Sequence, residues 1–150
     1  MLLHAPWGGR EVVEGARVLD AFAGTGAMGL EALSRGAAHA TFIERDPAAL
    51  AVLRRNVAAC GAEADIIAAD ACAPPRGRPC GLVFLDPPYG IELVPRAFAA
   101  LGAAGWIAPG ALVVAETARN EALPWPDILD ERTYGAARIT VRRAGGGGEV

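Results

Sequence analysis

The sequence contains no lysine, only two histidines and only three cysteines in 150 residues. All 14 basic residues are arginine, and 17 acidic residues leave a net charge of −3 at pH 7. This balance excludes a uniformly basic surface, so any contact with nucleic acid must come from a local patch. The three cysteines (Cys60, Cys72 and Cys80) are too widely spaced for a disulfide framework or a CxxC metal site. We therefore expect free thiols in a reducing compartment, and no metal.

Long apolar segments are also missing. The longest stretch without a charged residue, residues 97–115, is interrupted by glycines and by Pro109-Gly110. It predicts a helix end, a turn and a buried strand, not a membrane span. The N-terminus has no charged start followed by an apolar run, the pattern that is typical of a signal peptide. These features predict a cytoplasmic protein that does not associate with a membrane.

Small apolar side chains are abundant instead. Alanine supplies 33 residues, and Leu, Ile, Val, Phe, Met and Trp add 41 more, enough for a sizeable core. The length suits one domain that covers residues 1–150. Four consecutive glycines predict that residues 144–150 form a flexible tail.

Strand and helix patterns alternate along the chain. Apolar runs predict strands at residues 18–22, 40–43, 66–69, 82–85 and 111–115. Helices are predicted before Gly36, after an Asp46-Pro47 start, and over residues 93–101. Two further strands, 128–134 and 138–143, predict a hairpin about Gly135. The alternation indicates an α/β fold, a parallel sheet with helices on both faces.

Polar groups stand at the ends of four of the predicted strands. They are Asp20 with a glycine-rich loop, Glu44, Asp70, and Asp86 with two prolines. Ligands of such sheets bind outside the carboxyl ends of the strands, near the point where the strand order reverses. The sequence therefore predicts one ligand site at this edge of the sheet.

The glycine-rich loop matches a nucleotide-binding pattern. Gly24, Gly26 and Gly29 satisfy G-x-G-x-x-G, and Glu44 stands 20 residues after the first glycine, where a carboxylate can bind ribose hydroxyls. This motif alone also allows an NAD(P) oxidoreductase. Asp20, just ahead of the loop, could instead hold loop N–H groups or an ammonium. That arrangement favours S-adenosylmethionine, which carries an amino acid, over a pyrophosphate.

Asp70 and the segment Asp86-Pro87-Pro88-Tyr89 complete the chemistry. Asp70 could accept a hydrogen bond from an adenine amino group. The two prolines lack N–H donors, so carbonyl oxygens and the Asp86 carboxylate offer acceptors to an exocyclic –NH₂ group. Tyr89 supplies an aromatic face for a planar base. This pattern predicts methyl transfer to an amine, driven by proximity and hydrogen-bond acceptors without a metal.

The segment VLDAFAGTGAMGLEALSRGA at residues 18–37 closely resembles the cofactor loop and first helix of bacterial 16S rRNA (guanine-N2) methyltransferases. The resemblance continues through Phe-Ile-Glu at 42–44, Asp-Ala at 70–71 and Phe-Leu-Asp-Pro-Pro-Tyr at 84–89. It implies a class I S-adenosylmethionine-dependent methyltransferase (Rossmann-like) fold, with a mostly parallel seven-stranded sheet whose last strand is antiparallel. It also implies guanine 966 of 16S rRNA, in the small ribosomal subunit, as the target.

The same resemblance implies roles for individual residues. Asp86, Pro87, Pro88 and Tyr89 would form the catalytic site, in which Asp86 and the Pro87 carbonyl hold the guanine amino group and Tyr89 stacks on the base. The cofactor site would comprise Asp20, Phe22, Ala23, Gly24, Gly26, Glu44, Arg45, Asp70 and Ala71. Within it, Glu44 would bind the ribose, and Asp70 with the Ala71 amide would bind the adenine. S-adenosyl-L-homocysteine would be the product, and we expect a monomer.

The family usually carries a basic segment ahead of the cofactor loop. Only about 17 residues precede Val18 here, so residues 1–17 are interpreted as a stub of that segment, with Leu2-Leu3-His4 as the end of its last helix. Two alternatives stay open besides the oxidoreductase. One is adenine-N6 methylation of DNA or RNA, since the proline motif suits any planar amine. The other is an inactive fragment that binds cofactor without turnover.

Overall fold

The computed structural model describes residues 9–61, 63–88 and 90–145. The strands are β1 (Arg17–Asp20), β2 (His39–Glu44), β3 (Ala64–Ala68), β4 (Cys80–Leu85), β5 (Ile107–Ala118), β6 (Ile128–Tyr134) and β7 (Ala137–Arg143). The helices are α1 (Gly9–Val13), α2 (Ala27–Ser34), α3 (Pro47–Cys60) and α4 (Leu93–Ala103). Leu2-Leu3-His4, the expected helix end, lies outside the described residues.

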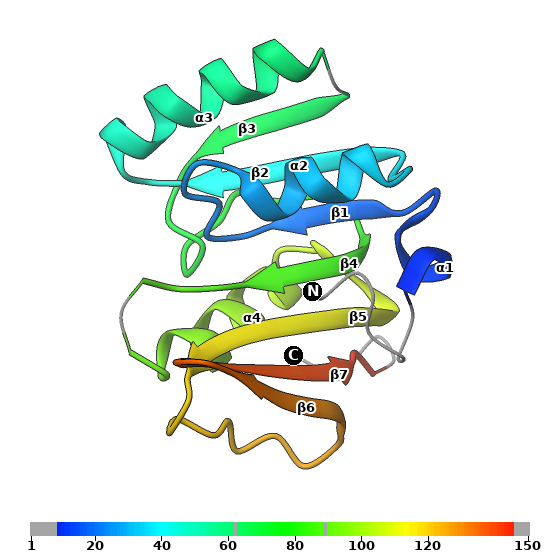
Figure 1. The fold of residues 1–150 in the computed structure, drawn as a ribbon, viewed down its shortest axis with the longest axis vertical. Helices are drawn as coiled ribbons and strands as arrows, with labels where there is room; N and C mark the ends of the chain where they lie inside the picture. The colour runs from blue at the N-terminus through cyan, green and yellow to red at the C-terminus, as the bar shows by residue number, and fades with distance from the viewer. Residues whose placement is uncertain (1–8, 62, 89, 146–150) are drawn as a thin grey trace.

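The strands form a seven-stranded sheet in the order β3-β2-β1-β4-β5-β7-β6 (Figure 1). The pairs from β3 to β5 are all parallel, whereas β7 runs antiparallel to both β5 and β6. This topology confirms the predicted sheet, with its antiparallel last strand and its C-terminal hairpin. The chain leaves β1 toward β2 on one side and later returns to β4 on the other. The strand order therefore reverses between β1 and β4, where α/β sheets bind ligands.

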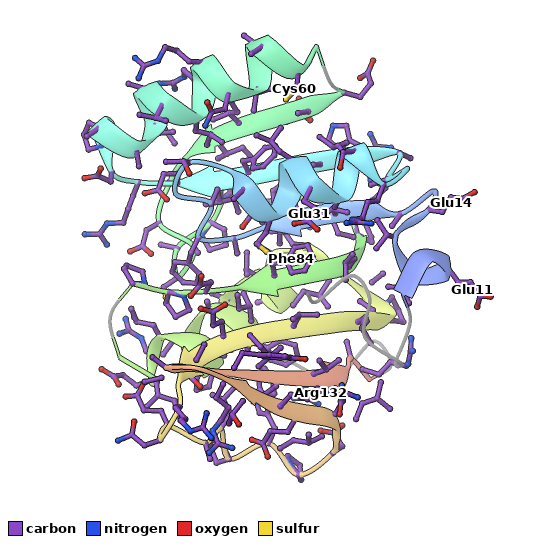
Figure 2. All side chains as sticks on the ribbon, in the orientation of Figure 1. Glu11, Glu14, Glu31, Cys60, Phe84 and Arg132 are labelled. Atoms are coloured by element: carbon purple, nitrogen blue, oxygen red, sulfur yellow. The ribbon has the colours of Figure 1, made fainter. Side chains whose placement is uncertain are left out.

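Helices cover both faces of the sheet, as expected. On one face, α1, α2 and α3 enclose a core that contains Leu53, Phe42 and Phe84. On the other face, α4 packs Phe98 and neighbouring residues against a second core. Figure 2 shows Phe84 inside the molecule and Glu11 projecting outward. Each core removes large apolar side chains from water, and this burial is the main favourable term in folding.

Local signals set the ends of the helices. The Asp46 carboxylate caps α3 by accepting the N–H of Ala49 at 2.9 Å, and Pro47 occupies its first turn. Gly36 follows α2 with φ 102°, a left-handed conformation that glycine adopts without a steric penalty. Both ends agree with the sequence prediction. The short helix α1 has no predicted counterpart, because five residues are too few to show a helical period.

Several strand boundaries differ from the prediction by one or more residues, and those of β1 and β5 bear on the site and on the sheet. Strand β1 ends at Asp20 instead of residue 22: the Ala21 N–H still donates to the Phe84 carbonyl of β4 at 3.1 Å, but Ala21 and Phe22 already form a turn. Strand β5 starts earlier, and Pro109-Gly110 forms an irregularity within it instead of a turn. Pairing with β4 shifts register there, and Gly110 has φ 78°. A bulge therefore accommodates the proline, which cannot donate to the sheet ladder.

Candidate active site

The glycine loop joins β1 to α2, and each glycine of the motif has its own structural reason. Gly24 and Gly26 have φ of 58° and 91°, so both need the left-handed region that glycine tolerates. Gly29 has another role: a Cβ atom there would lie 2.4 Å from Cε1 of Phe42. The third glycine thus lets α2 pack closely on β2. The glycine loop itself lies at the carboxyl ends of the strands.

Asp20 ends β1 and is only 3% exposed. One of its carboxylate oxygens accepts the N–H of Gly29, in the first turn of α2, at 3.0 Å. Burial raises the pKa of Asp20 to about 7, although the Gly29 hydrogen bond lowers it, and the nearby Asp86 and Glu44 carboxylates raise it further. Asp20 thus contacts the N–H of the third glycine of the motif, which lies in α2.

Glu44, at the end of β2, holds the other side of the loop. Its Oε1 accepts the Gly24 N–H at 2.7 Å, and its Oε2 accepts the N–H groups of Arg45 and Asp46 at 3.1 and 2.8 Å. The backbone N–H of Ala23 donates to Ile43 at 3.0 Å. The carboxylate thus orders the loop itself, and Oε1, which accepts a single N–H, keeps lone-pair capacity for a further donor.

The adenine side of the expected site lies at the end of β3. Asp70 accepts the Cys72 N–H at 2.9 Å, and its other oxygen accepts the Arg45 guanidinium at 3.2 Å. The neighbouring Ala71 is buried. Phe22, in the turn after β1, packs partly buried against the core on the α4 face. The structure therefore brings the nine expected cofactor residues to one edge of the sheet.

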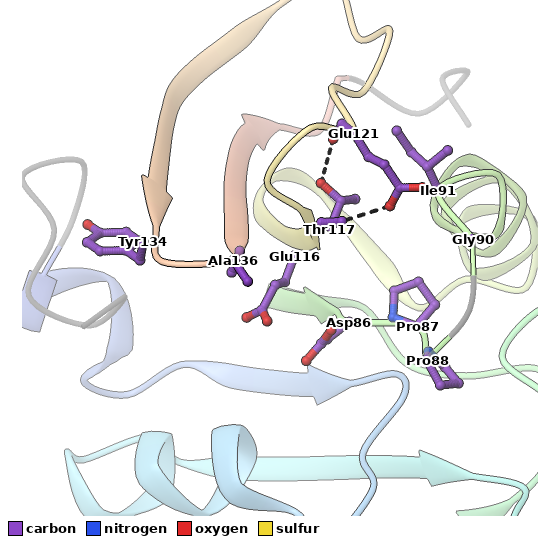
Figure 3. A pocket seen from close by; sticks show the side chains of 12 residues that line it. Asp86, Pro87, Pro88, Gly90, Ile91, Glu116, Thr117, Glu121, Tyr134 and Ala136 are labelled. Carbon is purple, nitrogen blue, oxygen red and sulfur yellow. Dashed lines mark hydrogen bonds between the residues drawn. The ribbon is translucent and has the colours of Figure 1, made fainter.

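A pocket of about 400 Å³ lies beside this edge (Figure 3). Its wall combines the end of β4, the end of β5, the start of the segment before α4 and the turn between β6 and β7. The lining residues are Asp86, Pro87, Pro88, Gly90, Ile91, Glu116, Thr117, Ala118, Glu121, Tyr134, Ala136 and Ala137. Three of the four expected catalytic residues line it, and the fourth, Tyr89, lies outside the described residues.

Asp86 combines accessibility with an unusual electrostatic environment. It remains accessible to solvent on the pocket wall. Burial by its surroundings nevertheless raises its pKa to about 6, and the Glu116 carboxylate adds to the rise. A carboxyl group of this kind accepts hydrogen bonds in its ionised form near neutral pH.

Sequence reasoning missed three residues of this region. Glu116 reaches the pocket from β5, Tyr134 reaches it from the hairpin, and Asn56 of α3 donates to the Thr25 carbonyl at 2.9 Å at the tip of the glycine loop. None of them belongs to a local motif. Only the position of Glu116 at the end of an apolar strand, as for Asp86, could have revealed it.

Arg76 and Arg78 form an exposed local pair of basic residues. They lie in the segment before β4, where Gly77 donates to Ala104 at 2.9 Å. Since Asp86 follows the other end of this six-residue strand, roughly 20 Å of strand separates the two arginines from the pocket. The fold therefore places these arginines at the opposite edge of the sheet.

Three further observations concern the described part of the chain. None of its helices is long and apolar enough to cross a membrane. No three His, Cys, Asp or Glu side chains within it converge as metal ligands would. The three cysteines are free thiols, and burial raises the pKa of the Cys72 and Cys80 thiols, which makes them weaker nucleophiles.

Comparison with known proteins identifies the family of the chain. Residues 5–143 match the family described as Conserved hypothetical protein 95. The chain belongs to this family. Ribosomal RNA small subunit methyltransferase D of Haemophilus influenzae is 37% identical over 127 residues, which cover 78% of this chain and 66% of that protein. The Escherichia coli K12 protein of the same name is 40% identical over 116 residues, 75% of this chain and 59% of its own.

Among solved structures, yhhF from Escherichia coli superposes with a TM-score of 0.82 and 35% identity, over 90% of this chain and 80% of that one. These relatives confirm the predicted family resemblance and the class I methyltransferase fold. The chain spans about three fifths to two thirds of the length of the two curated relatives.

Proposed function

We propose that the protein is an S-adenosylmethionine-dependent methyltransferase that modifies the exocyclic N2 amine of a guanine in 16S rRNA of the small ribosomal subunit. One observation supports this proposal above the others. A pocket with Asp86, Pro87 and Pro88 on its wall lies beside a glycine loop that is held by Asp20 and Glu44. The printed names of the curated relatives, small subunit rRNA methyltransferases, agree with it.

The residues at the sheet edge fit S-adenosylmethionine better than an anionic dinucleotide. Glu44 and Asp20 end the adjacent strands β2 and β1, and Asp86 directly follows β4, the next strand in the sheet. Burial is the main cause of the raised pKa of Asp20, and repulsion by the Asp86 and Glu44 carboxylates adds to it. A cofactor with an ammonium and a sulfonium relieves this repulsion, whereas a pyrophosphate adds to it. Asp20 would then face the amino acid part, Glu44 the ribose hydroxyls, and Asp70 with Ala71 the adenine.

The bound cofactor would supply a methyl group that its sulfonium already activates. The protein's task is then to bind and orient the amine. The Asp86 carboxylate and the Pro87 carbonyl accept the two amino protons and hold the nitrogen lone pair toward the methyl group. As the new C–N bond forms, positive charge develops on the nitrogen, and the carboxylate stabilises it. As the methyl–sulfur bond breaks, the nitrogen gives one proton to the Asp86 carboxylate, which can pass it to solvent, and the products are the methylated amine and S-adenosylhomocysteine.

The target base must leave its stack to reach this pocket. In the proposal Tyr89 stacks on the extruded base, and no cationic residue is among the described lining residues. A neutral base can enter such a pocket, while the phosphates stay outside it.

Calorimetric titration with S-adenosylhomocysteine, with NAD as the control, tests the cofactor class. We expect saturable binding of the first ligand only. Binding of NAD alone would contradict the proposal and favour an oxidoreductase.

Methyl transfer to unmodified small subunits, followed by mapping of the modified base, tests the substrate. We expect one N2-methylguanine in 16S rRNA. Methylated adenine would instead support the N6 alternative, and cofactor binding without any transfer would support the inactive fragment.

A further inference from the structure

Glu116 stands beside Asp86 because of the parallel register of β4 and β5. Leu85 pairs with Ala115, so Asp86 and Glu116 are the next residues on two neighbouring strands that point the same way. Figure 3 shows both carboxyl groups on the same side of the pocket. Burial is the main cause of the raised pKa of Asp86, and repulsion by the Glu116 carboxylate adds to it.

The hydrogen-bond donors and acceptors on the pocket wall differ in whether they already have a partner within the protein. Two donors on its wall are engaged within the protein: the Thr117 hydroxyl donates to the Glu121 carbonyl at 2.7 Å, and the Ala118 N–H donates to the Glu121 carboxylate at 3.3 Å. By contrast, neither Asp86 nor Glu116 accepts a side-chain or backbone donor from residues 9–61, 63–88 or 90–145. The pocket therefore presents two acceptor groups to a ligand.

Guanine and adenine differ in the atom beside their exocyclic amine. In guanine the N2 amine adjoins N1–H, so the edge presents adjacent donors. In adenine the N6 amine adjoins an unprotonated N1, whose lone pair would face a carboxylate. A pair of acceptors therefore matches guanine and repels adenine.

We propose that Glu116 is the residue that selects guanine, by accepting N1–H while Asp86 holds the N2 amine. This inference rests on the proposed function and adds a specificity residue to the same pocket. Glu116 touches the base but takes no part in the transfer of the methyl group.

The test uses 2-aminopurine, which keeps the N2 amine of guanine but has an unprotonated N1. Once the methylated guanine is mapped, RNA is prepared with guanine or 2-aminopurine at that position. For each RNA, kcat/KM of methyl transfer is measured with the wild-type chain and with Glu116→Gln. The glutamine amide can donate to N1 of 2-aminopurine, so it converts the repulsive contact into a hydrogen bond.

We expect the wild-type chain to prefer guanine, and Glu116→Gln to reduce the guanine-to-2-aminopurine ratio by about tenfold or more. The fluorescence of 2-aminopurine gives a second readout, and we expect tighter binding of the substituted RNA by Glu116→Gln. Glu121→Gln is the matched control, since it removes the same charge from the same pocket. Its substrate ratio is expected to equal that of the wild-type chain.

An unchanged ratio in Glu116→Gln, with both rates lowered together, would overturn this inference and assign Glu116 a structural or general electrostatic role. An equal change in Glu121→Gln would overturn it as well, because pocket charge alone would then set the preference. Failure of the proposed function looks different: the wild-type chain would methylate no guanine RNA at all.

Discussion

The Asp20 carboxylate and the Gly29 N–H form a 3.0 Å hydrogen bond that joins the end of β1 to the first turn of α2. This bond fixes the glycine loop between its two flanking elements. It also keeps a carboxyl group in a site where burial disfavours its charge. The Asp20 carboxyl thus holds the loop, although its ionised form lowers the stability of the fold. Functional sites often carry such a stability cost.

Asp20 makes the stability of the fold depend on pH. Its pKa is about 7 when folded, against 3.8 as the ordinary value, so the folded state binds the proton more tightly. The free energy of unfolding should therefore fall as pH rises from about 4 to about 7. Asp20→Asn should remove this component, on the order of 2–4 kcal/mol, in urea melts of the chain without cofactor. An unaltered pH slope in the variant would contradict the assignment.

Gly29 tests the contact between α2 and β2. Since a Cβ at this position would meet Phe42 at 2.4 Å, Gly29→Ala should destabilise the fold by roughly 1–3 kcal/mol. A smaller partner, Phe42→Leu, should recover part of that loss. Gly81→Ala is the control, because nothing lies within 4 Å of its Cβ position. Thermal melts of these variants would disprove the contact if both glycine replacements behaved alike.

We expect Glu44 both to bind the cofactor and to hold the glycine loop in place. Glu44→Ala removes the acceptor of the Gly24 N–H and the proposed ribose ligand. We expect the affinity for S-adenosylhomocysteine to fall by roughly 1–3 kcal/mol, measured by calorimetry. Glu63→Ala, an exposed carboxylate before β3, serves as the control. Equal affinities of the Glu44 variant and the wild-type chain would refute the ribose role.

We expect Asp86 to be needed for methyl transfer but not for binding of the cofactor. Asp86→Ala removes the acceptor that stabilises charge on the amine, at a cost of about 2–4 kcal/mol in the transition state. Single-turnover rates at saturating cofactor measure this effect. Parallel titrations with S-adenosylhomocysteine should match the wild-type chain. A variant with full activity would disprove the catalytic role.

The pocket carboxylates also predict how activity depends on pH. Because the pKa of Asp86 is about 6, its acceptor form is lost below that value, and kcat/KM should decline there. Glu116 contributes to the raised pKa. In Glu116→Gln the acidic limb of the profile should therefore move to lower pH. A profile that stays in place would mean that the limb belongs to another group.

Much of the fold follows from local patterns. The Asp46 cap, the Gly36 helix end and the hairpin about Gly135 depend on conformational preferences of nearby residues, so the sequence predicts them well. The glycine loop and the two prolines after Asp86 are local features as well, so they can also be read from the sequence. At Pro109-Gly110 the sequence predicts a turn, whereas the strand continues through a bulge there, held by hydrogen bonds of Gly110 and Ala111 to Ala144.

By itself the sequence determined which strands end in acidic residues and which loop carries the glycine pattern, because these features lie within short segments. Tertiary structure alone decided that Glu116 stands beside Asp86, that Asn56 reaches Thr25, and that Arg76 lies at the far edge of the sheet. Such relationships depend on strand order and register between segments far apart in the chain. Local propensities do not encode them, since they arise only when the two faces of the sheet are buried together.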